Sequence, residues 1–118
     1  MNKYVVTLVI AAGVPAAKAT SFDCSNAVTH AQKLICRDAT ISSLDDTVMS
    51  TYEQADDYLR RLPLLVATEQ DGFTNAHRAW LGERDRCAST HCLADSYRRR
   101  LDILNGDLVR YRSIYFYY

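Results

Sequence analysis

The sequence predicts an all-α fold, a small helical bundle of three to four helices stapled by two local disulfides. Three observations support this prediction. Apolar side chains recur every three or four residues along most of the chain, which is the period of a helix that buries one face. Four cysteines fall into two close pairs, and no run of alternating β-branched residues occurs outside residues 1–19.

Length, composition and charge narrow the classes of function. With 118 residues the chain has room for one domain and is too short for a multidomain enzyme. Its 48% apolar and 24% charged residues are typical of a globular protein rather than a disordered tail or a membrane protein. Its 14 basic residues are balanced by 14 acidic ones, which argues against a nucleic-acid partner, since phosphate binding needs a surplus of Lys and Arg.

Residues 1–19 have the three parts of a secretory signal peptide. Lys3 supplies a positive start, Tyr4–Val14 is an apolar run, and Ala17–Ala19 has the small residues that signal peptidase accepts. The apolar run is shorter than the ~20 residues that span a bilayer, which favours a cleaved leader over a membrane anchor. We therefore expect cleavage near Ala19, export to the periplasm or medium, and a single mature domain over residues 20–118.

The mature protein is expected to be soluble and slightly acidic. Residues 21–23, which precede Cys24, lack the small apolar side chains of a lipobox, so Cys24 is a poor lipidation site. Loss of Lys3 and Lys18 with the leader leaves 12 of the 14 basic residues against 14 acidic ones.

All four cysteines, Cys24, Cys36, Cys87 and Cys92, lie in the predicted mature part. An even number of cysteines in a small exported chain is typical of a disulfide framework. The alternative is a zinc site, but neither pair has the C-x2-C spacing, and an oxidising compartment disfavours free thiolates. Of the three possible connectivities we favour Cys24–Cys36 with Cys87–Cys92, because each bridge then closes a short loop.

The first long helix is expected between Asp38 and Leu62. Asp38 can act as its N-cap, and Pro63 ends it. Its stripe of apolar or large residues comprises Ile41, Leu44, Val48, Tyr52, Ala55, Leu59 and Leu62. A shorter helix is expected at about Asn26–Ile35, between the first two cysteines.

Two further stripes predict the rest of the bundle. The second has one residue per heptad, with Gln70 and His77 on the same face, and comprises Val66, Phe73, Trp80 and Cys87. The third comprises Leu93, Tyr97, Leu101, Leu104, Leu108, Tyr111 and Tyr115. The predicted core residues are Trp80, Phe73, Tyr52 and Tyr97. Trp80 is expected at the centre because of its size; the alternative is that it anchors a protein partner at the surface.

The sequence predicts no enzyme, no cofactor and no metal site. It lacks the short motifs of metalloproteases, dinucleotide-binding proteins, P-loop proteins and serine hydrolases. His30, His77 and His91 have no ligand spacing. His77 could be a general base or a ligand, but without a partner nucleophile a place at the edge of the core is favoured. Glu69 and Asp71 are two residues apart on a helix, so they point in different directions and do not form a glycosidase pair.

Five carboxylates are predicted on one flank of the first long helix. The three farthest from the core stripe, at about 120° to 160° from it, should face water. They are Asp46, Glu53 and Asp57. This acidic stripe is either an ordinary solvated face or a surface that steers a basic protein partner. The two carboxylates nearest the core, Asp45 and Asp56, are expected to pair with an arginine such as Arg84 or Arg100.

The chain ends in four aromatic residues. Tyr115 continues the helix stripe and is expected to pack. Phe116, Tyr117 and Tyr118 cannot all face one core, so part of this aromatic area is expected to be exposed. It is a second candidate contact surface, for a protein partner or for a second copy of the chain.

Short motifs spread over residues 22–104 resemble a known family. The first half has F-x-C at Phe22–Cys24, I-C at Ile35–Cys36 and L-D at Leu44–Asp45. The second half has W-L-x-x-R-D-x-C from Trp80 to Cys87 and C-L-x-x-x-Y-x-x-R-L from Cys92 to Leu101. In this order the motifs resemble the lysozyme inhibitor LprI-like domain family. Two features depart from that family: His77 stands where it usually has Gln, and this chain lacks the lipobox of its named member.

The resemblance implies an exported helical domain with two local disulfides. It also implies a protein partner, a lysozyme or a related peptidoglycan-degrading enzyme, which the domain would inhibit. Two other roles remain open at this point: an immunity or chaperone-like partner of an exported antibacterial effector, and a structural envelope protein. Fold follows from family resemblance more directly than function does.

Overall fold

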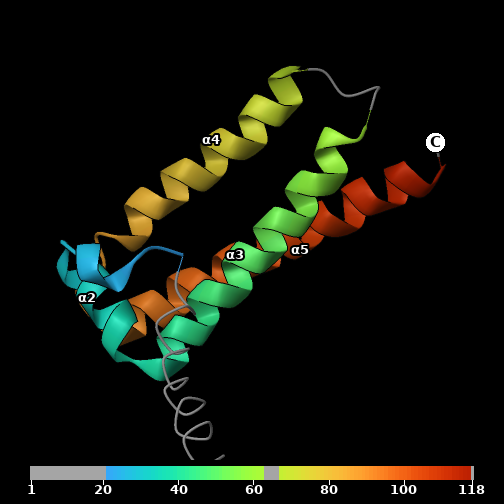
Figure 1. Cartoon of the computed structure of the whole chain (residues 1–118). Coiled ribbons are helices and arrows are strands. Elements are labelled where there is room, and N and C mark those ends of the chain that lie inside the picture. Colours follow the sequence, from blue (N-terminus) through green and yellow to red (C-terminus); the bar gives the residue numbers. More distant parts are fainter. Residues whose placement is uncertain (1–20, 63–66, 118) are drawn as a thin grey trace, which may run out of the picture.

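The computed structural model describes residues 21–62 and 67–117. This part of the chain contains four α-helices and no strand, so the predicted all-α fold is confirmed (Figure 1). The helices are α2 (His30–Arg37), α3 (Ala39–Arg60), α4 (Ala67–Arg84) and α5 (Thr90–Tyr117), and a 3₁₀ turn at Cys24–Asn26 precedes α2. The predicted leader with its cleavage near Ala19, the stop at Pro63, and the residues Val66 and Tyr118 lie outside the described ranges.

Side-chain caps determine where α2 and α3 begin. Thr29 Oγ1 accepts a hydrogen bond from Gln32 N at 3.0 Å, and Gln32 Oε1 accepts one from Thr29 N at 3.1 Å, which forms a capping box. The predicted N-cap of α3 is confirmed, since the Asp38 carboxylate accepts from the backbone N–H groups of Thr40 and Ile41.

The short helix is shifted from its expected position at Asn26–Ile35. It begins at His30 and ends at Arg37, because residues 24–26 form the 3₁₀ turn instead. The Asp23 carboxylate holds this turn by accepting a hydrogen bond from Ser25 N at 3.0 Å. The capping box at Thr29 then provides a separate start for α2.

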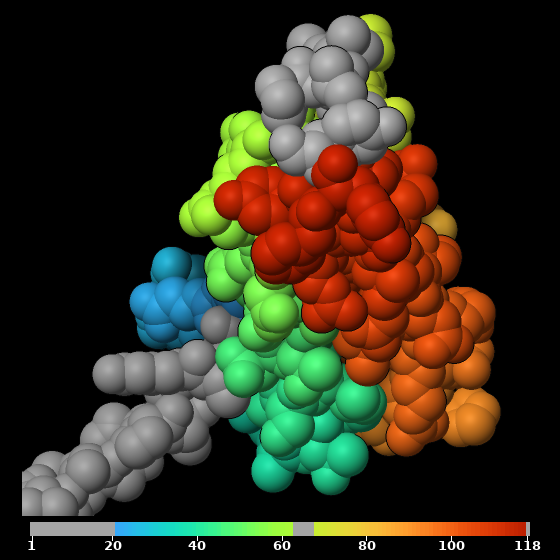
Figure 2. All heavy atoms as spheres, turned by 90° about the vertical axis from the view of Figure 1, so that its right-hand side faces the viewer, coloured from blue at the N-terminus to red at the C-terminus, as the bar shows by residue number. Residues whose placement is uncertain are grey.

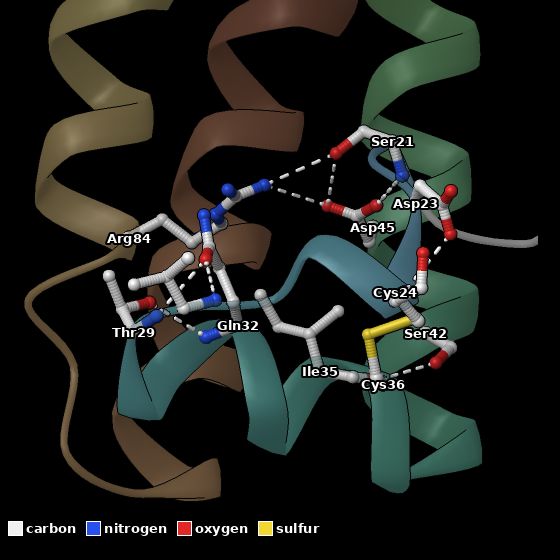
Figure 3. The surroundings of a disulfide bond; sticks show 12 residues. Ser21, Asp23, Cys24, Thr29, Gln32, Ile35, Cys36, Ser42, Asp45 and Arg84 are labelled. Carbon is white, nitrogen blue, oxygen red and sulfur yellow. Dashed lines mark hydrogen bonds and ion pairs between the residues drawn. A yellow bond between two sulfur atoms is a disulfide. The ribbon is translucent and has the colours of Figure 1, made fainter.

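Both predicted disulfides are present, Cys24–Cys36 and Cys87–Cys92. All four cysteines are therefore oxidised, which excludes the zinc alternative. The first bridge attaches the 3₁₀ turn to the last part of α2 (Figure 3). The second lies at the connection of α4 to α5, because α4 ends at Arg84 and Cys87 belongs to the turn that follows rather than to the helix.

The longest helices, α3 and α5, lie side by side along most of their length, and both views show this pair (Figures 1 and 2). In Figure 1 the ribbon of α4 is set apart from the pair. Contacts between aromatic rings connect α4 to both helices. Tyr52 of α3 stacks on Phe73 of α4 with a centroid distance of 5.0 Å, and Phe73 meets Tyr111 of α5 edge-on at 5.6 Å. Aromatic side chains are larger than aliphatic ones, so they bridge the space between α4 and the pair of α3 and α5.

The four residues predicted as core lie in or beside this contact. Tyr97 is fully buried, Phe73 and Trp80 are 6% and 7% exposed, and Tyr52 is half-buried. Trp80 meets Tyr97 edge-on at 5.4 Å, and its Nε1–H donates a hydrogen bond to Ser96 Oγ at 3.0 Å. Within the described ranges, no helix combines the length and the apolar character needed to cross a membrane.

The two disulfides should contribute unequally to stability. They close loops of different length, with sequence separations of 12 and 5. On the chain-entropy model, replacing Cys24 and Cys36 by Ser should lower the free energy of unfolding by about 3 kcal/mol, against about 2 kcal/mol for the Cys87 and Cys92 pair. Urea unfolding of both variants and the parent measures the difference; a larger loss for the Cys87 and Cys92 pair would contradict this entropic account.

Candidate functional site

A buried carboxylate on α3 collects donors from three other segments. Asp45 is 1% exposed and accepts hydrogen bonds from Tyr97 OH at 2.7 Å, Arg84 Nη1 at 3.2 Å and Ser21 Oγ at 3.2 Å. It also accepts from the backbone N–H of Ser21. Figure 3 shows Ser21 and Arg84 reaching Asp45 from different parts of the chain. We call Asp45, Arg84, Tyr97 and Ser21 the Asp45 cluster.

Arg84 brings a positive charge into this cluster, and two carboxylates balance it. Its guanidinium lies 3.2 Å from Asp45 and 2.9 Å from Asp85, and its side chain is 5% exposed. Its Cζ lies 5.3 Å from the ring centroid of Phe22 and 5.9 Å from that of Trp80. These contacts compensate the Arg84 guanidinium for the hydration that it loses on burial. The expected partnership of Asp45 with an arginine is thus met by Arg84.

Asp56 also pairs with an arginine, but this is Arg60 of its own helix and neither Arg84 nor Arg100. Its carboxylate pairs with Arg60, one turn later on α3, with 2.7 Å between Nε and Oδ2. A pair four residues apart forms within one helix without any tertiary contact, so it satisfies Asp56 locally. Arg100, the other arginine considered for this role, contacts His77 instead.

His77 and Arg100 form a second buried polar contact, between α4 and α5. They are 4% and 5% exposed, and Arg100 Nη2 lies 3.2 Å from His77 Nδ1. Because a guanidinium can only donate, Nδ1 accepts and the imidazole is neutral with its proton on Nε2. Burial, and then the positive charges of Arg100 and Arg84, lower the pKa of His77 to about 4. The Tyr52 ring stacks on the imidazole at 3.9 Å.

These buried groups connect the helices to one another. Burial first, and then the neighbouring Asp45, raise the pKa of Tyr97 well above its usual range, so its hydroxyl remains a donor. Among the described residues, the ring and hydrogen-bond contacts of His77 are with Tyr52, Trp80 and Arg100. In the described part of the chain, no three or more His, Cys, Asp or Glu side chains are grouped so as to hold a metal ion.

The three outer carboxylates of α3, Asp46, Glu53 and Asp57, are exposed, and we call them the acidic face. From Ala39 to Leu59 this helix contains no Lys or Arg. Asp57 is partly neutralised by an exposed ion pair with Arg61, with 3.2 Å between Nη2 and Oδ2. Asp46 and Glu53 therefore carry most of the negative charge of the acidic face.

The aromatic end of α5 lies against the last turns of α3. Tyr115 is half-buried, with its ring centroid 5.4 Å from that of Tyr58. Phe116 and Tyr117 are 72% and 85% exposed, while Tyr118 lies outside the described residues. Because Tyr58 follows Asp57 directly, the aromatic end and the acidic face approach each other where α3 and α5 end. In Figure 2 this end of α5, in red, lies at the surface beside α3, in green.

Two partnerships were not predicted from the sequence. Ser21 contacts Asp45 across 24 positions, and no local pattern indicates that contact. The contact of His77 with Arg100 spans 23 positions, and no local sequence pattern indicates it either. A signal did exist for the Asp45 cluster: Asp45, Arg84 and Tyr97 each belong to one of the short motifs that carry the family resemblance, and the structure brings them together.

Removing the Asp45 charge should destabilise the fold strongly. Asp45→Asn leaves buried donors without their anion, and we expect the free energy of unfolding to fall by about 3 to 5 kcal/mol. Asp46→Asn is the matched control, since the same change one residue later is exposed and should cost less than about 0.5 kcal/mol. Urea unfolding of both variants compares them; equal stabilities would show that the Asp45 cluster does not hold the helices.

Stability should also depend on the protonation of His77. The unfolded chain takes up a proton near pH 6.5, whereas the folded protein takes it up near pH 4. The free energy of unfolding should therefore be greatest above pH 6.5 and fall by on the order of 3 kcal/mol as the pH drops to about 4. His77→Gln keeps an acceptor for Arg100 but does not titrate. Its unfolding curves should lack this part of the pH dependence, and an unchanged dependence would assign the effect to other groups.

Comparison with known proteins identifies distant relatives of this chain. The chain is 30% identical over 85 residues to the lipoprotein LprI of Mycobacterium bovis and of two Mycobacterium tuberculosis strains. The match covers 69% of this chain and 39% of the relative, so the chain spans about two fifths of the length of the curated relatives it matches. No family model and no solved structure matches the chain. The chain is thus distantly related to lipoprotein LprI.

Proposed function

We propose that this chain is an exported protein-binding domain that inhibits a lysozyme or a related peptidoglycan-degrading enzyme. The observation that carries the proposal is the 30% identity to lipoprotein LprI, together with the motifs of the lysozyme inhibitor LprI-like family. Residues 1–19 would direct export and be removed near Ala19. The two disulfides are consistent with an oxidising compartment outside the cytoplasm.

The acidic face of α3 is the surface that we assign to the target enzyme. Many lysozymes are strongly basic, and complementary charges speed the encounter of two proteins and orient them. Asp46 and Glu53 have no ion pair among the described residues, so their charges are available to a partner. The aromatic end, Phe116 and Tyr117, would add apolar contact area beside it.

A surface on α3 also has the rigidity that a tight inhibitor needs. The core-facing side of the helix is buried against α5, and at its edge Asp45 is held in place by four hydrogen bonds. Partners that are ordered before binding lose less conformational entropy in the complex. This supports a preformed helix face as the contact surface rather than a segment that folds on binding.

The proposal is tested with the oxidised protein and a panel of lysozymes. Lysis is followed as loss of turbidity of a cell-wall suspension, and the protein should slow lysis by at least one enzyme in proportion to its concentration. Protein whose disulfides have been reduced with dithiothreitol is the control, and it tests whether inhibition requires the folded state. Undiminished lysis by every enzyme, with the protein shown to be folded and oxidised, would reject inhibition.

The acidic face is tested by neutralising it against a matched set. Asp46→Asn, Glu53→Gln and Asp57→Asn together should slow association with a basic lysozyme and flatten its salt dependence, while stability barely changes. The control removes three other exposed carboxylates, Asp71, Asp95 and Asp102, for the same change in net charge. It is well matched because Asp95, like Asp57, has an exposed arginine partner. Equal association rates of the two variants at low salt would move the contact to the aromatic end, which a chain ending at Ile114 then tests.

A further inference from the structure

A small pocket opens between α4 and α5, away from the acidic face. Its volume is about 210 Å³. Trp80 and Ser96 line it, Ala79 and Ile103 add apolar surface, and Glu83 and Arg100 bring opposite charges. Water occupies about 30 Å³ per molecule in the liquid, so the pocket has room for a ligand with a few carbon atoms rather than for a large cofactor.

Arg100 is the unusual residue of this pocket. It is 5% exposed, yet its one side-chain hydrogen bond is to the neutral imidazole of His77. Within residues 21–62 and 67–117, no carboxylate forms an ion pair with it, and its Nε is buried without a hydrogen-bond partner. Arg84, buried to the same extent, has two carboxylates in contact. The fold thus places two carboxylates in contact with one buried guanidinium, whereas Asp107 and Glu83 act on Arg100 from beyond ion-pair distance.

We propose that this pocket binds a small aliphatic carboxylate, whose anionic group pairs with Arg100 and whose carbon chain lies against Trp80 and Ile103. A buried guanidinium gains more from a carboxylate than an exposed one does, because it has already lost its hydration. The apolar walls favour a ligand with a short hydrocarbon portion. Either a free short-chain acid or the terminal carboxylate of a peptide has this chemistry.

Glu83 has only a weak influence on the charge of the ligand. It lies on the same pocket, but its side chain is exposed and hydrated, so it attracts a cation weakly and repels an anion weakly. The desolvated charge of Arg100 therefore decides the sign of the ligand. The inference goes beyond the proposed function, since the pocket lies on α4 and α5, the acidic face lies on α3, and the test requires no lysozyme.

Trp80 provides a direct reporter, because it is the single tryptophan of the chain and lines the pocket. The oxidised protein, labelled with ¹⁵N, is titrated with butyrate, butyramide and n-butylamine while the one indole N–H resonance is followed. Butyrate should shift this resonance with a dissociation constant on the order of millimolar, as suits so small a ligand. N-acetyl-alanyl-alanine and its C-terminal amide then distinguish a peptide terminus from a free acid as the source of the carboxylate.

Variants locate the ligand within the pocket. Arg100→Gln should abolish the butyrate shift, and Ala79→Leu should do so by filling the pocket while leaving Arg100 in place. Glu83→Gln should tighten butyrate binding roughly threefold, since it removes one nearby like charge. Arg99→Gln, at an exposed position on the same pocket, is the control for general loss of positive charge and should weaken binding much less than Arg100→Gln.

Four results would overturn the proposal. These are equal binding of butyrate and butyramide, preference for n-butylamine, a butyrate shift that survives Ala79→Leu, and the absence of any shift with either carboxylate probe. If Arg100→Gln does not fold, Ala79→Leu and Glu83→Gln still decide, because both replace exposed side chains.

Discussion

The carboxylate of Asp45 must be surrounded by donors once α3 and α5 pack together, because a buried unpaired charge is far less stable than a hydrated one. The donors come from the segment before α2, from the end of α4 and from α5. Meeting this requirement therefore sets the positions of three segments relative to α3. Arg84 has further N–H donors to satisfy, and Asp85, at the next position of the chain, accepts from them.

The attachment of α4 differs from the packing of α3 on α5. Aliphatic residues such as Val48, Leu59 and Leu104 are fully or almost fully buried between the long helices. On α4, by contrast, Phe73, His77 and Trp80 make ring contacts with Tyr52, Tyr111 and Tyr97. Ring contacts allow a wider spacing of helix axes, and polar groups can lie among them. The buried polar pair His77–Arg100 and the pocket beside it lie at this ring-rich contact of α4 with α5.

The residues that carry the likeness to the LprI-like family belong largely to the framework. Asp45, Arg84, Trp80 and Tyr97 are buried, and the four cysteines form bridges. The acidic face and the aromatic end are exposed and lie outside those motifs. The framework and the contact surface that we propose are therefore separate sets of residues. A chain can keep this framework while its exposed residues select a different partner.

The sequence alone determined the helical fold, the N-cap at Asp38, the pairing of the cysteines and the burial of Asp45 beside an arginine, because these follow from helical period, capping chemistry and short loop closure. It did not determine the start of α2, where a 3₁₀ turn competes with the helix for the same residues. The spacing of four residues between Asp56 and Arg60 does indicate their pair within α3, because such a pair needs no tertiary contact, and our expectation of a partner on another helix overlooked it. That Arg100 faces His77 and a pocket, and that Ser21 contacts Asp45, was decided by the tertiary structure. The partner of such a side chain depends on which segment lies opposite it, and sequence spacing within one helix carries no information about that neighbour.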